Sequence, residues 1–404
     1  METEVEFGQL LGVMAVAVSV PLLLGLVPRL PIPASVVEIV AGIVIGPAVL
    51  GWVEPDQVIV VLAKLGVGVL LFLAGIELDF RLLRGRPLKL GIAAFALSLG
   101  IGLACTMPLG VADVIIDPLF VTVVLSATAL GIVMPVLKDT GQVSTKFGTI
   151  VIATCTVAEF GSIVALSMLF SGSGSSHPAQ TMAKLAVLAL AVLVIAVVAA
   201  RATDHPRFNT VLRRLENTSS QIRVRIAVLI LIGLLVLAAD LKLDAILGAF
   251  LAGALLAALG EKGPANDDIG HFRHKVEGIG FGFFVPVFFV STGLGFPLDE
   301  LFSDSSALLR IPLFLVLLLA ARGLPALLLR RDLAPTQLLP AALLQATSLS
   351  FIVVATEIGV STGELRPINA ASLLAAGMCS VLVFPGSAVA LLRRKPAEVP
   401  TPDS

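Results

Sequence analysis

The chain has 404 residues, of which 57% are hydrophobic and only 14% are charged, and its mean hydropathy is +1.03. Soluble domains carry roughly 25% charged residues, so this composition excludes an ordinary soluble protein and predicts one that crosses a membrane many times. The net charge of −1 suggests no basic surface for nucleic acid. The three cysteines lie in apolar segments, and we expect them to be small core residues.

Apolar runs of about 17 to 25 residues are long enough to cross roughly 30 Å of hydrocarbon, and each predicts a membrane helix. In chain order, thirteen such runs lie at about 9–28, 34–52, 58–77, 88–109, 113–136, 147–170, 180–200, 222–240, 243–260, 277–296, 306–329, 336–359 and 367–392. We therefore expect an all-α polytopic membrane protein with about 13 transmembrane helices. Residues 1–395 are expected to form a single membrane transporter domain, followed by a short disordered cytoplasmic tail at 396–404.

Basic residues gather in every second loop between these segments. One set of loops holds Arg29, Arg81, Arg84, Arg86, Lys89, Lys138, Lys146, the Arg201 to Arg225 cluster, Lys262, Arg273, Lys275, Arg330, Arg331, Arg393, Arg394 and Lys395. The other set holds only Lys64, Lys184, Lys242, Arg310 and Arg366. Because cytoplasmic loops are enriched in Lys and Arg, we expect a protein of the cell membrane with its N-terminus outside and its C-terminus in the cytoplasm.

Two charged residues lie deep inside predicted membrane helices. Glu159 interrupts the otherwise uncharged run Phe147–Phe170, and Arg322 lies within the run 306–329. A charge at the bilayer centre costs at least about 2.5 kcal/mol, so it is expected to be neutralised, paired or used. A buried carboxylate can hold a proton or a cation, whereas Arg does not deprotonate, so Glu159 is the candidate ion site and Arg322 its counter-ion. The alternative is a fixed Glu–Arg pair that stabilises the core.

Two segments far apart in the chain resemble each other. Leu78-Asp79 at the end of the third helix precedes Ala127-Thr128-Ala129-Leu130 in the fifth, and Leu298-Asp299 precedes Ala346-Thr347-Ser348-Leu349 at nearly the same distance. The offset of seven helices is odd, so matching features fall on opposite faces of the membrane. An inverted-topology repeat of this kind supports alternating access, with a site at the midplane where the repeats meet.

These two segments are also unusually polar for mid-membrane positions. The first contains Ser126, Thr128, Gly131 and Pro135, and the second contains Gln345, Thr347, Ser348 and Ser350. Polar and helix-breaking residues at corresponding places in two repeats predict interrupted helices, whose freed carbonyls and helix ends can hold a cation. The alternative is that these hydroxyls bond back to their own helices or bridge neighbouring ones.

Five stretches together resemble the monovalent cation/proton antiporters of the Kef and sodium/proton exchanger branch. They read VVEIVAGIVIGP from residue 36, LGVGVLLFLAGIELDF, SATALGIVMPVLKDTG, LDAILGAFLAGALL and PVFFVSTGLGFPLDEL. The resemblance implies a homodimer, with a core formed by helices near 58–170 and 277–392 and a dimerisation part and connection near 9–52 and 180–260. It also implies that the fifth and twelfth segments are two discontinuous crossing helices and that the sixth carries the ion-binding carboxylate.

Carried over by position, the resemblance makes Glu159 the proton and cation site. Ser126, Thr128, Ser348 and Ser350 become candidate ligands for the ion or proton, while Ala127, Gly131 and Thr347 mark the broken-helix segments. The residue before the carboxylate, an acid or amide in the family, is Ala158 here, which argues for electroneutral exchange. Many relatives have Gly-Glu where this chain has Leu349-Ser350, and a Lys or Arg at the position of Arg322.

The leading hypothesis is a secondary antiporter that exchanges Na⁺ or K⁺ for protons across the bilayer. A proton-coupled carrier of another small solute on the same scaffold, or a membrane sensor without transport, remain alternatives. The sequence contains no GxxxxGK[ST] loop for ATP-driven transport. We therefore expect no enzyme activity, no cofactor, no metal beyond the transported cation, and no nucleic acid as partner.

Overall fold

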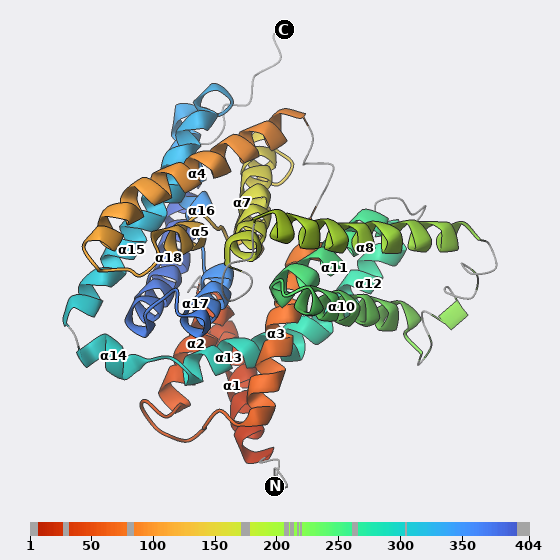
Figure 1. Ribbon diagram of the computed structural model, residues 1–404, viewed down its shortest axis with the longest axis horizontal. Coiled ribbons are helices and arrows are strands. Elements are labelled where there is room, and N and C mark those ends of the chain that lie inside the picture. Colours follow the sequence, from red (N-terminus) through yellow and green to blue (C-terminus); the bar gives the residue numbers. More distant parts are fainter. Residues whose placement is uncertain are drawn as a thin grey trace. The chain divides into compact units, whose positions relative to one another are not determined.

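The computed structural model describes residues 7–26, 32–78, 85–170, 178–205, 220–260, 266–303 and 305–393, together with 210, 214, 215 and 218. Within these ranges every regular element is a helix (Figure 1). Several residues used in the predictions lie outside the described part of the chain, namely Arg29, Asp79, Arg81, Arg84, Lys262, Arg394, Lys395 and the tail 396–404.

The thirteen predicted apolar segments all appear as helices in the described residues. Eleven helices are long and apolar enough to cross a membrane, and two shorter apolar helices, Ala34–Ile45 and Ala245–Leu259, account for the second and ninth segments. The chain is therefore a polytopic, all-helical membrane protein, as its composition predicts.

The second segment is shorter than predicted. Helix α2 (Ala34–Ile45) ends before Gly46, whose backbone is extended because Pro47 follows it. Beyond this point the chain folds back, so that the backbone N–H groups of Trp52 and Val53 both donate to the carbonyl of Ile45, at 3.0 and 3.1 Å. The fifth segment likewise starts later than predicted, at Pro118, because the Asp117 side chain caps the helix that begins there.

Contacts divide the chain into two compact units. The first comprises residues 1–80 and 163–296, and the second comprises 81–162 and 297–404. Helix α7 (Lys146–Phe170) contributes to both. This division groups α3 (Gln57–Ile76) and α13 (Val285–Leu294) with the first unit, whereas the sequence analysis assigned them to a core part. The functional meaning of the two parts stays a prediction.

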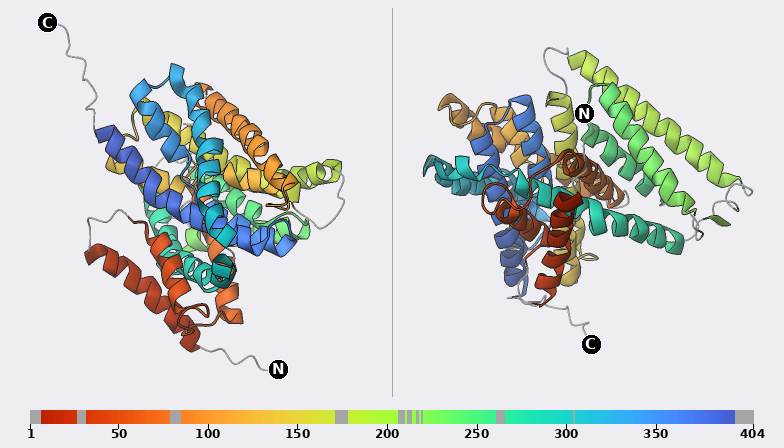
Figure 2. Two further views of the ribbon diagram at one scale, coloured as in Figure 1. Left: turned by 90° about the vertical axis from the view of Figure 1, so that its left-hand side faces the viewer. Right: turned by 90° about the horizontal axis from the view of Figure 1, so that it is seen from below.

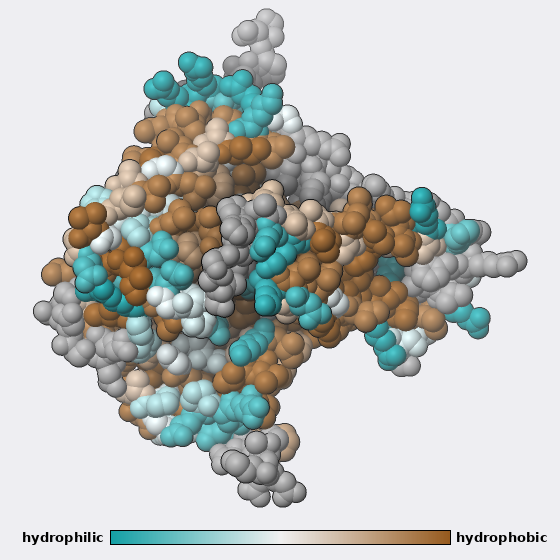
Figure 3. All heavy atoms as spheres, viewed as in Figure 1, coloured by the Kyte–Doolittle hydropathy of each residue, from teal (hydrophilic) through white to brown (hydrophobic). Residues whose placement is uncertain are grey.

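The first unit is built on close helix packing. Its further helices are α1 (Phe7–Leu26), α8 (Pro178–Asp204), α10 (Ile222–Asp240), α11 (Ala245–Gly260), α12 (Asn266–Ile279) and the π-helix η1 (Gly280–Phe284). Helix α13 packs on α2 and α3, and α11 packs on α3 and α10. Helices α8 and α10 lie side by side (Figure 2), and α8 exposes a largely apolar surface (Figure 3), as expected of a helix that faces lipid.

Glycines make two of these contacts possible. Gly42 of α2 and Gly293 of α13 face each other so closely that a Cβ on either would meet the partner helix's backbone. Gly75 of α3 and Gly253 of α11 form a second pair of the same kind. Small residues at helix contacts in membranes let backbones approach and increase van der Waals contact, which is a main driving force where water is absent.

The second unit contains both predicted breaks. Its helices are α4 (Gly85–Val111), α5 (Pro118–Leu125), α6 (Leu130–Asp139), α14 (Leu298–Ser303), α15 (Ser305–Gly323), the 3₁₀-helix η2 (Leu324–Arg331), α16 (Pro335–Gln345), α17 (Ser350–Thr362) and α18 (Pro367–Arg393). The first break, residues 126–129, separates α5 from α6, and the second break, residues 346–349, separates α16 from α17. The prediction of two discontinuous helices is confirmed.

Candidate functional site

The two breaks contact each other directly inside the second unit. The Thr128 hydroxyl donates to the carbonyl of Gln345 at 2.6 Å, and the backbone N–H of Ala129 donates to the carbonyl of Thr347 at 2.9 Å. The Thr128, Gln345 and Thr347 side chains are fully buried. The backbone groups that each break leaves without a partner in its own helix therefore find hydrogen-bond partners in the other break. Lipid could not provide these hydrogen bonds.

Glu159 projects from α7 to the start of α6. Its side chain is only 7% exposed, and one carboxylate oxygen accepts from the backbone N–H of Leu130 at 3.3 Å. Leu130 is the first residue of α6, and Ala129 before it provides no side-chain cap. The positive end of a helix dipole favours a negative charge, so α6 stabilises the ionised form of this buried carboxylate.

Arg322, near the end of α15, is fully buried. Its Nε donates to the Thr128 hydroxyl at 2.9 Å and its Nη1 donates to the Ser98 hydroxyl at 3.0 Å. Its Nη2 has no hydrogen-bond partner among the described residues. Arg322 therefore joins α15, α4 and the first break through hydroxyl groups.

The two buried charges contact the same short stretch of the chain. Glu159 accepts from the backbone N–H of Leu130, and Arg322 donates to the hydroxyl of Thr128, two residues earlier. The two deepest charges of the sequence thus lie in one buried region of the second unit, and the counter-ion role of Arg322 stays a prediction.

Two of the predicted ligand and break residues use their hydroxyls within their own helices. Ser126 donates to the carbonyl of Thr122 at 2.8 Å, and Thr347 donates to the carbonyl of Leu343 at 3.1 Å. Bonds of this i to i−4 kind satisfy a hydroxyl locally and are common in membrane helices.

The other predicted residues differ in exposure. Ala127 is fully buried next to Thr128, whereas Gly131, in the first turn of α6, is exposed. Ser350 is the first residue of α17 and is partly exposed. The Ser348 hydroxyl is buried and has no hydrogen-bond partner among the described residues.

Two serines that the sequence analysis did not single out support the breaks. Ser98 accepts from Arg322 and donates to the carbonyl of Ala94 at 2.9 Å. Ser380 of α18 contacts the second break, where its hydroxyl accepts from the Ser348 backbone N–H at 3.2 Å. Its one proton is shared between the carbonyls of Gly377, at 2.7 Å in its own helix, and Ser348, at 3.0 Å. A lone serine in an apolar helix usually bonds back to its own helix, so the sequence carried no signal for either role.

This arrangement suits a proton or a small monovalent cation. It combines one buried carboxylate with hydroxyls and backbone carbonyls, which are hard oxygen ligands. Within the described ranges, no group of three or more His, Cys, Asp or Glu side chains is close enough together to hold a metal ion.

Comparison with known proteins places the chain in a family. Residues 14–394 match the family described as "Sodium/hydrogen exchanger, transmembrane". The chain belongs to the sodium/hydrogen exchanger family. Members of this family are transporters rather than enzymes, and the resemblance to the monovalent cation/proton antiporters is confirmed.

Individual members of the sodium/hydrogen exchanger family are similar to the chain over most of its length. It is 28% identical over 365 residues to the putative Na⁺/H⁺ antiporter YjbQ of Bacillus subtilis, covering 87% of this chain and 57% of YjbQ. It is 26% identical over 341 residues to the Na⁺/H⁺-K⁺ antiporter GerN of Bacillus cereus, covering 83% of this chain and 84% of GerN. The chain thus spans little more than half the length of the first of these relatives.

A solved structure supports the fold of this chain. The sodium proton antiporter MjNhaP1 of Methanocaldococcus jannaschii superimposes with a TM-score of 0.64 over 95% of each chain. Only 15% of the residues are identical, so this likeness concerns the fold and not the chemistry of the site.

Proposed function

We propose that the protein is a secondary antiporter that exchanges a monovalent cation, Na⁺ or K⁺, for protons, with Glu159 as the shared site. The observation that carries the proposal is the position of this buried carboxylate at the positive end of α6, beside two breaks that bond to each other. Relatives named as Na⁺/H⁺ and Na⁺/H⁺-K⁺ antiporters support the choice of substrates.

Competition for one carboxylate explains how the two ions are coupled. A buried carboxyl group binds a proton or a cation, but the proton removes the charge that attracts the cation. If Glu159 is exposed alternately to the two sides of the membrane, each turnover carries one ion one way and the other ion back. Alternating access of this kind is expected of an inverted-repeat fold with interrupted helices.

The residues around Glu159 suggest how many charges move in each turnover and how the carboxylate is stabilised when neither ion is bound. Ala158 is fully buried and offers no ligand, so one carboxylate carries one charge in each direction, and the exchange is electroneutral. Arg322 acts as the counter-ion of Glu159 when neither ion is bound, which avoids an isolated buried charge. The Thr128 hydroxyl links Arg322 to the first break and so places it near the ion site.

The proposal includes a location and an assembly. The distribution of Lys and Arg supports the cell membrane, with the N-terminus outside and the C-terminus in the cytoplasm. The family resemblance supports a homodimer. Both are proposed together with the exchange function.

The test is exchange by the purified protein in liposomes. Dissipation of a pH gradient is recorded after addition of Na⁺, K⁺, Li⁺ or choline, with and without an imposed membrane potential. Glu159→Gln is expected to abolish cation-dependent proton movement. Glu357→Gln is the matched control, because Glu357 is exposed on α17 and not buried at a break.

The outcomes separate the parts of the proposal. Exchange at the wild-type rate in Glu159→Gln would exclude Glu159 as the shared site. A rate that depends on the membrane potential would contradict electroneutral exchange. Absence of proton movement with every cation would contradict antiport and favour a sensor or a carrier of another solute.

A carrier of another small polar solute is the second candidate. Both polar atoms of the Gln345 amide are fully buried without a hydrogen-bond partner among the described residues. A buried amide without partners costs about 1 to 3 kcal/mol, and a polar solute could supply its missing hydrogen bonds. Gln345→Leu would weaken such transport but leave cation exchange by Glu159 intact.

A further inference from the structure

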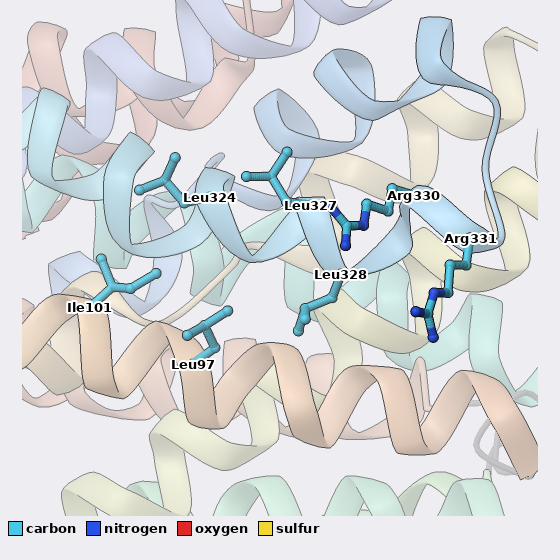
Figure 4. A pocket seen from close by; sticks show the side chains of 7 residues that line it. All are labelled: Leu97, Ile101, Leu324, Leu327, Leu328, Arg330 and Arg331. Atoms are coloured by element: carbon cyan, nitrogen blue, oxygen red, sulfur yellow. The ribbon is translucent and has the colours of Figure 1, made fainter.

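An open groove lies between α4 and the 3₁₀-helix η2 in the second unit. It measures about 450 Å³, and its walls are leucine and isoleucine side chains, with Arg330 and Arg331 completing the lining (Figure 4). Leu97 and Ile101 rise from α4 toward η2, and the two arginines lie together at one end of the groove. The groove is therefore apolar along most of its length and cationic at one end.

The 3₁₀ geometry of η2 creates this pattern. With three residues per turn, side chains three apart stand in one row, so Leu324, Leu327 and Arg330 follow one another along the helix. Leu328 and Arg331 form a second row beside the first. At about 2 Å per residue, Leu324 and Arg330 lie roughly 12 Å apart, which approaches half the thickness of the hydrocarbon core.

The arginines at the end of the groove have no acidic partner in the described part of the chain. The nearby carboxylate of Asp332 is already engaged by Arg86, at 2.8 and 3.0 Å, and by Lys146 at 3.8 Å. Arg330 and Arg331 are both exposed. Asp332 follows Arg331 directly in the chain, and its carboxylate is already engaged by two other cations, so the positive charge of Arg330 and Arg331 favours an anionic ligand.

We propose that this groove binds an anionic phospholipid, with an acyl chain along the leucine rows and the phosphate at Arg330 and Arg331. Charge selects the headgroup, and the length of the apolar rows, roughly 12 Å, approaches the depth of the acyl chains in one leaflet. Guanidinium groups suit phosphate because they form two parallel hydrogen bonds with it. The inference concerns a lipid site and does not depend on the transported ion.

Fluorescence quenching by brominated lipids tests this site. The sequence contains one tryptophan, Trp52, so Trp52→Phe with Leu324→Trp leaves a single reporter at the apolar end of the groove. The protein is reconstituted in phosphatidylcholine vesicles that contain a growing fraction of brominated phosphatidylglycerol, or of brominated phosphatidylcholine as reference. Each arginine near a membrane surface favours an anionic lipid about fivefold, so we expect a preference of about 25-fold for phosphatidylglycerol.

Two double variants show where the preference comes from. Arg330→Gln with Arg331→Gln is expected to remove it, while quenching in pure brominated phosphatidylcholine stays unchanged and confirms a folded protein. Arg225→Gln with Arg393→Gln removes the same charge from exposed positions on other helices, and it should keep the preference.

Three results would overturn the proposal. Equal quenching by the two headgroups in the parent would mean that the groove binds lipid without selecting its charge. A preference that survives the loss of both groove arginines would place the anionic site elsewhere. If the reporter is shielded from brominated chains of both kinds, protein covers the groove, as a second copy of the chain would.

Discussion

The two helix breaks have the same length but differ in how their ends are satisfied. Each comprises four residues, and each is followed by a half-helix whose first residue has no side-chain cap of its own. At the first break, Glu159 from α7 accepts from the leading N–H of α6. At the second, Ser380 from α18 bonds to the backbone of Ser348.

The difference assigns different tasks to the two breaks. A carboxylate changes charge when it binds a proton, whereas a serine hydroxyl stays neutral at all physiological pH values. We therefore propose that the first break responds to both proton and cation, and that the second serves as a neutral framework for the first.

The largest expected effect concerns Arg322. If it is the counter-ion of Glu159, Arg322→Met should reduce exchange by about two to four orders of magnitude, because breaking a buried pair costs about 3 to 5 kcal/mol. The coupling free energy between Arg322 and Glu159 is measured by a double-mutant cycle with Glu159→Gln, in which the thermal stabilities of the single and double variants are compared in detergent. Additive effects would mean that Arg322 serves the framework and not the ion site.

A carboxyl group outside both breaks also responds to pH. Burial raises the pKa of Glu77 to about 7, although nearby Arg273 lowers it, and Glu277 raises it further. The folded protein holds this proton more tightly than the unfolded chain does. The protonated group therefore makes its full contribution to the free energy of unfolding below about pH 4.5, and this contribution is lost as the pH rises through about 7. The rise from 4.5 to about 7 corresponds to at most roughly 3 kcal/mol.

Glu77→Gln should therefore flatten the pH dependence of the unfolding temperature over this range. Exchange should keep its own pH profile in the variant, because that profile is assigned to Glu159. If the unfolding temperature of Glu77→Gln still falls as steeply with pH, another titratable group is responsible.

The hydroxyl of Thr128 joins the two breaks and is predicted to matter more than that of Thr347. Thr128→Val leaves the buried Nε of Arg322 and removes its partner, which should cost about 2 kcal/mol of unfolding free energy. Thr347→Val removes a bond within its own helix and should cost less than about 1 kcal/mol. Equal losses in denaturant unfolding would mean that the contact between the breaks carries no special weight.

The smallest effect is expected at the second break. Ser380→Ala removes both bonds to the Ser348 backbone and should cost about 1 kcal/mol. Ser348→Ala removes a buried hydroxyl without a described partner and should be neutral or slightly stabilising. Loss of exchange in Ser348→Ala at unchanged stability would instead give this hydroxyl a direct role in binding the ion.

The lengths of the apolar runs and the positions of polar residues within them predicted most of the fold. The thirteen segments could be read from the sequence because lipid requires long apolar helices, and the breaks could be read because Ser, Thr and Pro gather there. The end of α2 at Ile45 was missed, since Gly46 and Pro47 turn the chain while it is still apolar. Hydropathy does not distinguish an apolar loop from an apolar helix.

The candidate site was predicted less completely. Glu159 and Arg322 stood out because charges are rare in membrane helices, and both proved to be buried beside the first break. Ser98 could not be found, because its link to Arg322 joins residues 224 positions apart. Similarly, the spacing of the polar residues along the chain did not predict that Ser126 would bond to its own helix while Thr128 bonds to the other break.

The facing glycines of the first unit have a consequence for movement. Sliding α2 along α13 would move Gly42 away from Gly293 and bring the bulkier Ile39 or Ile45, three residues away on the same helix face, toward the partner's backbone. The same applies to α3 and α11 at Gly75. Each pair is therefore locked in one axial register. When one helix of a pair is displaced, we expect its partner to travel with it, because the backbones are too close for one helix to slide along the other.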